Sequence, residues 1–370
     1  MEHTEFLETA PLFRKWVAIA TVGAALERRV WLNTGRVLYP NLYTFLIGKA
    51  GIGKTAGIDI ATDILREIPD FHLSPTSMSR ASLVDSLAEC KRSIVMLPHP
   101  MVEYNTMFVA VDELSALMHQ WDTDLVSALT KFYDCNAFAE AKRKETLRHK
   151  LDRPQLSVLC GTTPSNLMDL VPATAWGQGF MSRVILIYSD TKSFRNILDV
   201  SKIGSPDHLI HDLKLIGANY GQIAWDPSYN RLLHEWREGG CRPVPQHPRL
   251  SDYCSRRVAH LLKLSMIACV DAGGKLTLSE EHFKTALGWL LEAELNMGEI
   301  FQAGSTTVDA RAMEEIEDFI RRQGKPVPHH QLVHQAARIV PTHAVLKVIE
   351  LLWLSGRVKK SDDNHYLLVD

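Results

Sequence analysis

The 370-residue sequence has no apolar run that approaches the ~20 residues needed for a membrane helix. Its start, Met-Glu-His-Thr-Glu, is acidic and lacks the basic-then-apolar order of a signal peptide. The six cysteines show no Cys-x-x-Cys spacing, so we expect reduced thiols rather than disulfides or zinc ligands. Together these absences predict a cytoplasmic protein with no membrane partner.

The sequence also lacks an excess of charge of either sign. Its net charge is −2, so any nucleic-acid surface must come from local patches rather than from the whole chain. It has no repeat at solenoid spacing and no low-complexity segment. With 46% hydrophobic and 23% charged residues it is typical of a globular protein, and its length allows two or three units.

Residues 41–225 alternate short apolar runs with helical patterns, which predicts an α/β core with a largely parallel sheet. A helix is expected at Ala56–Leu65. Residues 1–40 look helical up to a turn at Asn33-Thr34-Gly35. Strands are predicted at Leu42–Ile47, Ser93–Leu97, Met107–Val111, Leu156–Cys160 and Val184–Tyr188.

The last third of the chain is mostly helical. Residues 226–305 predict a helical lid, with helices at Val258–Val270 and Glu280–Phe301, and Gly304–Thr307 is expected to be a linker. Residues 306–370 predict three helices and two short strands, the order found in a winged helix. The helices are expected at Ala310–Gln323, His330–Arg338 and Thr342–Ser355, and the strands at Arg357-Val358 and Tyr366–Val369.

A phosphate-binding pattern, Gly-x-x-x-x-Gly-Lys-Thr, lies between a predicted strand and a predicted helix. Bare backbone N–H groups can surround phosphates where a Cβ would collide, and the N-terminus of the following helix favours the same charge. We expect Lys54 to neutralise phosphate oxygens and Thr55 to hold Mg²⁺. The nucleotide-binding residues predicted by the pattern are Gly48, Gly51, Ile52, Gly53, Lys54 and Thr55.

Two strand ends carry further candidate groups. Asp112 and Glu113 follow an apolar strand; Asp112 is expected to bind Mg²⁺ and the nucleotide, and Glu113 to polarise the attacking water. The alternative for both is an acidic helix start. Thr162 and Thr163 follow another strand, and Thr163 is the favoured residue to sense the γ-phosphate or orient the water. Its alternative role is to cap the next helix.

Basic residues form three further candidate sites. Arg183 follows a Gly-x-Gly turn and, taken alone, is more often a solvated or ion-paired residue. Arg256, His260 and Lys263 share one face of a predicted helix, with a solvated basic face as the alternative. Residues 141–150 carry five cations and one acid, which suits sequence-independent contact with DNA phosphates, although such runs are commonly only solvated. The DNA-binding residues predicted there are Lys142, Arg143, Lys144, Arg148 and Lys150.

The order of these motifs resembles the AAA+ core of minichromosome-maintenance helicases, and still more the phage and mobile-element helicases with a related core. Thr163-Pro164 stands where that family has Asn-Pro, and Ser182-Arg183 matches its Ser-Arg pair before the next strand. The resemblance covers roughly residues 10–305. It implies a ring, expected to be a hexamer, in which Arg183 acts in trans on a neighbour's ATP. It also implies a lid arginine, Arg256 or Arg257, at the γ-phosphate and a DNA-gripping hairpin at the basic segment.

We therefore expect an ATP- and Mg²⁺-dependent helicase of phage or mobile-element type, with Glu113, Arg183 and Thr163 as catalytic residues. The alternative is an ATP-gated DNA-binding switch, such as a helicase loader, initiator or transposition regulator, that does not unwind DNA. A third alternative is an ATPase that acts on protein. The winged helix is expected either to touch phosphates through Lys347, Lys359 and Lys360 or to dock replication proteins.

Overall fold

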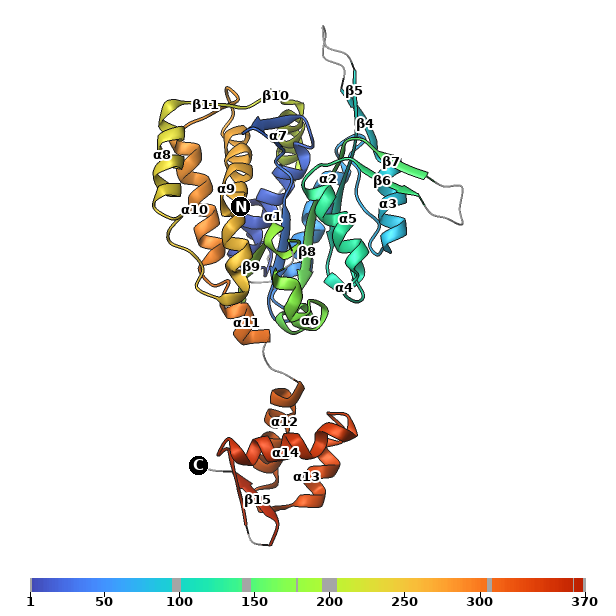
Figure 1. Cartoon of the computed structure of the whole chain (residues 1–370), viewed down its shortest axis with the longest axis vertical. Helices are drawn as coiled ribbons and strands as arrows, with labels where there is room; N and C mark the ends of the chain where they lie inside the picture. Colours follow the sequence, from blue (N-terminus) through green and yellow to red (C-terminus); the bar gives the residue numbers. More distant parts are fainter. Residues whose placement is uncertain are drawn as a thin grey trace. The chain divides into compact units, whose positions relative to one another are not determined.

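The computed structural model describes residues 2–94, 101–141, 148–177, 179–194, 205–304, 308–361 and 363–368. The chain divides into two compact units, residues 1–301 and residues 302–370 (Figure 1). The predicted boundaries at 40/41 and 225/226 both lie inside the first unit. Among the described residues, no helix combines the length and apolar character needed to span a bilayer.

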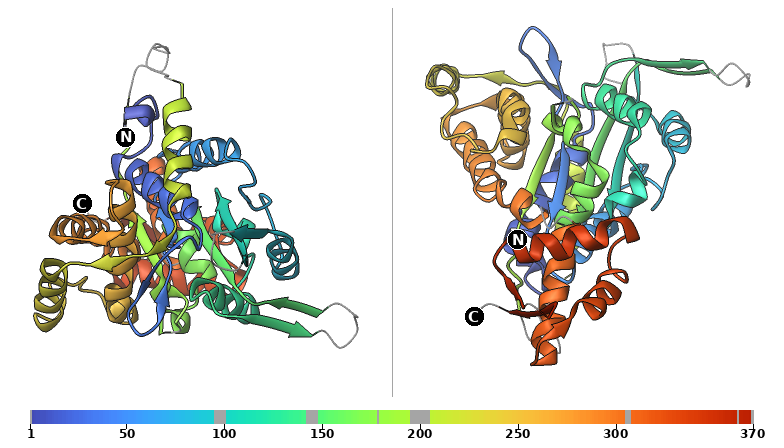
Figure 2. Two further views of the ribbon diagram at one scale, coloured as in Figure 1. Left: turned by 90° about the horizontal axis from the view of Figure 1, so that it is seen from above. Right: turned by 60° about the horizontal axis from the view of Figure 1, so that its bottom comes forward.

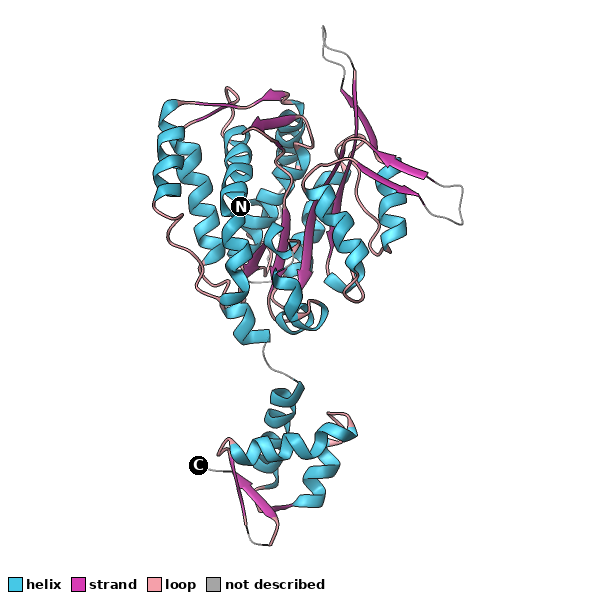
Figure 3. Ribbon diagram, in the orientation of Figure 1, coloured by secondary structure: helices cyan, strands magenta, loops and turns pink. Residues whose placement is uncertain are grey.

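The first unit is a mixed α/β structure built on a five-stranded sheet (Figure 3). Four of its strands are parallel, and only the edge strand β4 runs antiparallel to its neighbour, which confirms the predicted, largely parallel sheet. Every residue of β3, β8 and β9 is buried, as expected for strands covered on both faces. The strand order is β4 (Lys91–Ile94), β5 (Val102–Val111), β8 (Pro154–Thr162), β3 (Tyr43–Ile47) and β9 (Val184–Tyr188).

The outer edge of β5 is shared by two segments. β4 pairs antiparallel with Val102–Asn105. Further along, Leu73 forms a parallel bridge with Phe108, whose N–H donates to His72 and whose carbonyl accepts from Ser74, both at 2.9 Å. Of the predicted strand Ser93–Leu97, residues 93 and 94 belong to β4, and residues 95–97 lie outside the described part of the chain.

Helices lie on both faces of this sheet (Figure 2). α1 and α2 pack against β8 and against α7, and α5 also packs against β8. The helix predicted at Ala56–Leu65 is confirmed within α2. These elements are α1 (Pro11–Ala25), α2 (Lys54–Arg66), α3 (Arg80–Glu89), α4 (Leu114–Leu117), α5 (Thr123–Tyr133), α6 (Pro164–Leu170) and α7 (Asp207–Ala218).

The prediction that residues 1–40 are helical is wrong beyond Ala25. The backbone turns left-handed at Glu27, where φ is +48°, and β1 (Val30–Asn33) and β2 (Val37–Leu38) then form an antiparallel pair. The buried Glu27 carboxylate accepts hydrogen bonds from Tyr104 and Arg92, so contacts distant in sequence fix this turn. The turn predicted at Asn33-Thr34-Gly35 is confirmed, since the Gly35 N–H donates to the Asn33 side chain at 3.1 Å.

The C-terminal part of the first unit is helical, as predicted, and its longest helix, α9, packs against α1, β1 and residues 181–183. The helix predicted at Val258–Val270 lies within α9, whereas the one predicted at Glu280–Phe301 is interrupted after Glu294. α10 packs against α8, α9 and strand β9. The elements are β10 (Gly221–Gln222), β11 (Ala224–Trp225), α8 (Pro227–Glu238), α9 (Ser251–Asp271), β12 (Thr277–Leu278), α10 (Glu280–Glu294) and α11 (Glu299–Gly304).

A two-stranded antiparallel pair projects from the first unit between α5 and β8 (Figure 1). It consists of β6 (Phe138–Ala141) and β7 (Arg148–Leu151), with Ala141 opposite Arg148. Of the basic segment, residue 141 and residues 148–150 belong to these two strands. Residues 142–147 lie outside the described part of the chain.

The second unit has three helices and a three-stranded antiparallel sheet with the order β13-β15-β14. It has a hydrophobic core of its own, which includes Ile316, Leu332 and Val348. The three predicted helices and two predicted strands are present, and β13 was not anticipated. The elements are α12 (Val308–Gln323), β13 (Val327–Pro328), α13 (His329–Ala336), α14 (Val345–Leu354), β14 (Val358–Lys360) and β15 (His365–Leu368).

Candidate functional site

The glycine-rich loop between β3 and α2 is fixed by two close approaches. Gly53 caps α2 with φ of +80°, and a Cβ there would lie 2.6 Å from the Thr9 hydroxyl oxygen. That buried hydroxyl donates to the Gly53 carbonyl at 2.8 Å, so the N-terminal segment is tied to the loop. At Gly48 a Cβ would lie 2.4 Å from the Ser189 carbonyl oxygen. Only glycine suits these two positions, and the loop backbone is consequently held in one conformation.

Lys54 folds back over this loop. Its Nζ donates to the Gly48 carbonyl at 2.7 Å and to the Lys49 carbonyl at 3.0 Å, and the side chain is 7% exposed. Burial lowers the pKa of the Lys54 ammonium below its ordinary value, while the nearby Glu113 carboxylate opposes this shift. The loop thus holds a cation in its centre that is bonded only to neutral carbonyl groups.

A cavity of about 480 Å³ brings together groups from four parts of the sequence. The glycine-rich loop and the first turn of α2 form one side, and the carboxylates that follow β5 form another. Thr163, which follows β8, and Glu8 near the N-terminus contribute the rest, whereas the predicted residues Gly48 and Ile52 do not line the cavity. The cavity is lined by Glu8, Ala50, Gly51, Gly53, Lys54, Thr55, Ala56, Asp112, Glu113 and Thr163.

Thr163 has the capping role that was the alternative to sensing. Its hydroxyl accepts the backbone N–H of Asn166 at 3.2 Å and so caps α6, although its side chain also lines the cavity. The Asn166 side-chain amide donates to Glu113 Oε1 at 2.6 Å and to the Thr162 hydroxyl at 3.3 Å. Sequence reasoning missed Asn166; its one local signal is that it is the third residue of a helix capped at the end of a strand.

Arg183 and Arg256 lie together, outside this cavity. Arg183 is 6% exposed, and its guanidinium donates to Asp134 from Nε at 3.1 Å and from Nη2 at 2.5 Å. Arg256 Nη1 lies 3.9 Å from the same carboxylate. Burial and then the charge of Arg183 lower the pKa of Arg256. One carboxylate therefore stands between two arginines, and the cluster keeps a net positive charge.

Arg257 is separated from this cluster by its own ion pair. Its fully buried guanidinium donates from Nε and Nη2 to the two oxygens of Glu294, both at 2.7 Å. The Tyr253 hydroxyl donates to the same carboxylate at 2.9 Å. Of the two arginines that the sequence could not distinguish, only Arg256 lies beside Arg183.

Two of the three basic residues predicted to share a face of this helix are shielded from solvent, and Arg256 is one-third exposed. His260 and Lys263 are buried between α9 and the sheet. His260 Nε2 lies 2.9 Å from the Ser182 carbonyl, and burial lowers its pKa to about 3. Lys263 Nζ donates to the Asn41 side chain at 2.7 Å, and burial lowers its pKa to about 8. These side chains join the helical region to the core.

The predicted DNA-binding residues are only partly described. Lys142, Arg143 and Lys144 lie outside the described residues, and Arg148 is the first residue of β7. Lys150 is exposed, and its Nζ lies 3.1 Å from Asp152. A surface ion pair of this kind contributes little to stability.

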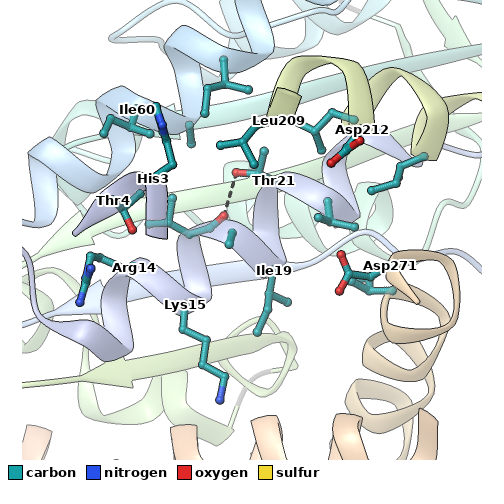
Figure 4. A pocket seen from close by; sticks show the side chains of 18 of the residues that line it. His3, Thr4, Arg14, Lys15, Ile19, Thr21, Ile60, Leu209, Asp212 and Asp271 are labelled. Atoms are coloured by element: carbon teal, nitrogen blue, oxygen red, sulfur yellow. Dashed lines mark hydrogen bonds between the residues drawn. The ribbon is translucent and has the colours of Figure 1, made fainter. Parts of the chain in front are cut away.

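A second cavity, of about 410 Å³, lies among α1, α2, α7, α9 and α10. Its walls are mostly apolar, with Arg14 and Lys15 at one end and Asp212 and Asp271 at the other (Figure 4). Its lining includes none of the residues predicted for nucleotide or DNA. Over the described part of the chain, no group of three or more His, Cys, Asp or Glu side chains is arranged to hold a metal ion.

Comparison of the chain with protein-family models and with curated proteins found no match.

Proposed function

We propose that the protein is a P-loop ATPase of the AAA+ type that uses ATP to move along or unwind DNA. The observation that carries the proposal is the cavity in which the glycine-rich loop, Lys54, Thr55 and the two strand-end carboxylates meet. These groups come from separate segments, and only folding brings them to one place. A chance match to the loop pattern would not be expected to bring Asp112 and Glu113 to its side.

The cavity suits a nucleoside triphosphate. The backbone N–H groups at the start of the 13-residue helix α2 face an anion-binding position, and Lys54 adds a buried cation. The Lys54 ammonium donates to two neutral carbonyl groups. A charged phosphate oxygen is a stronger acceptor for this ammonium than a carbonyl oxygen, because it adds Coulomb attraction.

The same cavity suits Mg²⁺ bound together with phosphate. Mg²⁺ usually keeps several waters and takes one or two carboxylates plus substrate phosphates, rather than a cage made wholly of protein groups. The Thr55 hydroxyl and the Asp112 carboxylate line the cavity and would hold it. When bound, ATP supplies the transferable phosphoryl group and Mg²⁺ neutralises charge on it.

Within this site Glu113 is the residue proposed to accept a proton from the attacking water. Lys54 would stabilise the charge that develops on the phosphoryl oxygens. Arg183 and Arg256 do not line the cavity of their own subunit. Arg183 is buried and ion-paired with Asp134, which is the alternative weighed for it, so its proposed role toward a neighbour's nucleotide rests on the family resemblance. The same resemblance supports a ring of identical subunits, for which we propose a hexamer.

DNA is proposed as the polymer that this ATPase acts on. The support is the charge of the basic segment 141–150, of which Arg148 and Lys150 lie on β7, and the resemblance to ring helicases. In the second unit, three helices followed by an antiparallel pair of strands support a winged helix. That unit is proposed to contact DNA or replication proteins.

Strand displacement on forked DNA with ATP and Mg²⁺ tests the proposal as a whole. We expect wild-type protein to hydrolyse ATP and release the displaced strand, and Glu113→Gln to bind ATP without either activity. ATP hydrolysis with ATP-dependent DNA binding but no displacement would overturn the motor and favour an ATP-gated switch. No ATP binding would overturn the ATPase itself.

A further inference from the structure

We propose that Asn166 is the positioning residue for Glu113, held in place by the helix cap that Thr163 forms. The role assigned to Asn166 rests on the proposed ATPase function. Asn166 does not line the nucleotide cavity, whereas Glu113 does. Its influence on the reaction must therefore pass through the carboxylate that it contacts.

The contact of Asn166 with Glu113 has an unambiguous direction. An ionised carboxylate only accepts hydrogen bonds, so the amide nitrogen rather than the amide oxygen must face Glu113 Oε1, at 2.6 Å. The same nitrogen lies 3.3 Å from the Thr162 hydroxyl oxygen on β8. The two amide hydrogens thus link the carboxylate that follows β5 to the end of the neighbouring strand β8.

The backbone of Asn166 is fixed by the start of α6. Thr163 caps the helix by accepting the Asn166 backbone N–H at 3.2 Å, and Pro164 occupies the first helical position. The Thr163 hydroxyl also lies 3.3 Å from the Ser165 hydroxyl. Thr163 therefore orients the residue that orients Glu113.

The chemical consequence concerns which oxygen of Glu113 is available. Oε1 accepts the amide hydrogen bond, which leaves Oε2 as the oxygen that can accept a proton from water. Removing the donor should loosen the carboxylate and so misplace the oxygen that faces the water.

The first test measures ATP hydrolysis and ATP binding by the full chain. Asn166→Asp keeps the shape of the side chain but replaces the donor with a second carboxylate, and Asn166→Ala removes it. We expect kcat to fall about 10- to 100-fold in both, from the loss of a hydrogen bond to a charged group. The Kd for ATP should stay within about twofold because Asn166 does not line the cavity.

Ser165→Ala is the matched control, since this residue lies on the same helical turn and its hydroxyl contacts Thr163 rather than Glu113. It should keep kcat close to the wild-type value. An equal loss in Ser165→Ala would show that α6 as a whole, and not the Asn166 amide, determines the rate, and would overturn the proposal.

The split between kcat and the Kd for ATP provides a readout that a purely structural role would not give. A general distortion of the site should change both quantities, whereas loss of the Asn166 donor should lower kcat alone. A loss of ATP affinity that matches the loss of kcat in both variants would contradict a positioning role.

A double-mutant cycle separates action through Glu113 from an independent contact with the reactants. If Asn166 acts through Glu113, then Asn166→Ala should not slow further the residual hydrolysis of the Glu113→Gln variant, measured in single turnover at high enzyme concentration. A further loss similar to that in the wild-type background would overturn the proposal.

The outcomes distinguish this inference from the proposed function. Hydrolysis at the wild-type rate by Glu113→Gln would remove the base assignment and this inference together. If Glu113→Gln loses hydrolysis while both Asn166 variants keep the wild-type rate, the ATPase proposal stands and only the role of Asn166 is wrong.

Discussion

The ammonium group of Lys54 lies among carbonyl oxygens of the loop that precedes it, at 2.7 and 3.0 Å. A buried cation with only neutral partners is well suited to exchange them for an anion, because hydrogen bonds between charged groups are roughly twice as strong as neutral ones. Lys49 belongs to the same loop, but its side chain is exposed. The two lysines therefore form a natural pair for comparison.

We predict that Lys54→Ala weakens ATP binding by about 10- to 100-fold or more, as expected for a lost charge-assisted hydrogen bond. Lys49→Ala should bind within a few fold of wild type. Titration calorimetry measures both. Equal losses in the two variants would contradict a specific role for Lys54.

Arg257 and Arg256 should affect different properties: Arg257 the stability of the first unit, and Arg256 the rate of ATP hydrolysis. Arg257→Ala leaves Glu294 buried without its cation, which should lower the free energy of unfolding of the first unit by about 3–5 kcal/mol. Arg256 is one-third exposed, and Arg256→Ala should cost less than about 1 kcal/mol while slowing hydrolysis. Urea unfolding and ATP turnover of both variants check this; a stability loss confined to Arg256→Ala would reverse the assignment.

The sequence could predict Lys54, Asp112 and Glu113 because a contiguous pattern specifies their chemistry. It could not predict Asn166, whose role depends on a contact with Glu113, 53 residues away. Nor could it separate Arg256 from Arg257. Adjacent residues point to different sides of a helix, and only the packing of α10 decides which side meets Glu294.

α9 links the helical region to the sheet through His260. Its Nε2 lies 2.9 Å from the Ser182 carbonyl and its Nδ1 lies 3.4 Å from the Tyr133 hydroxyl, which suits a neutral ring that donates from Nε2. Burial, and to a lesser extent the charges of Lys263, Arg256 and Arg257, hold its pKa at about 3, against the ordinary 6.5. The folded protein therefore resists protonation of this side chain.

We predict a loss of stability on the acid side that is traceable to His260. Above pH 6.5 the ring is neutral in both the folded and unfolded states and contributes no pH dependence. Below it the unfolded chain binds a proton that the folded chain does not, so stability falls by about 1.4 kcal/mol per pH unit down to about pH 3.

The measurement compares the free energy of unfolding at pH 7 and pH 5.5 for wild type and His260→Gln, whose amide can keep both hydrogen bonds. Wild type should lose about 1–1.5 kcal/mol more than the variant over this interval. His211→Gln, at an exposed position, should behave as wild type. Identical pH dependence in wild type and His260→Gln would exclude this source of acid sensitivity.

The longer elements were accessible from sequence and the two-residue strands were not. β3 and β9 are almost wholly apolar, and β8 contains the apolar run Val158–Cys160, which is the pattern of strands buried on both faces. β10, β11 and β12 have two residues each, too few for any periodicity. The end of α1 could not be predicted from the sequence either, because the left-handed turn at Glu27 depends on partners such as Tyr104 that are distant in sequence.

At the scale of the whole molecule, each unit has its own hydrophobic core, and that of the second includes Ile316, Leu332 and Val348. We predict that residues 302–370 produced alone fold and unfold cooperatively. Ile316→Ala, at a fully buried position, should remove about 2–5 kcal/mol and unfold most of so small a unit. Leu346→Ala, at a position 63% exposed, should have little effect.

Circular dichroism during heating checks this prediction. A fragment with helical signal and a sigmoidal transition, lost in Ile316→Ala and kept in Leu346→Ala, is the expected result. A fragment without a transition would show that the second unit depends on the first.

The proposed ring makes a prediction about mixtures of inactive subunits. Lys54→Ala subunits still offer Arg183, and Arg183→Ala subunits still offer a complete cavity, so mixing the two should restore part of the ATPase activity. Each variant alone should be inactive, because the arginine contributes to the transition state of a neighbour. Activity measured across mixing ratios checks this, and no gain at any ratio would count against a finger supplied in trans.

The two edges of the central sheet differ in a way that bears on how the protein behaves in concentrated solution. β4 ends one side with the exposed residues Lys91 and Ser93, and a short cationic edge discourages a strand from another molecule from adding to it. The opposite edge strand, β9, is wholly buried, and α10 packs against it. Any condition that loosens the helical region, such as acid acting on His260, would uncover Val-Ile-Leu-Ile-Tyr as a bare apolar edge. On acidification, turbidity should therefore rise before helical content falls, which makes turbidity the earlier sign of aggregation.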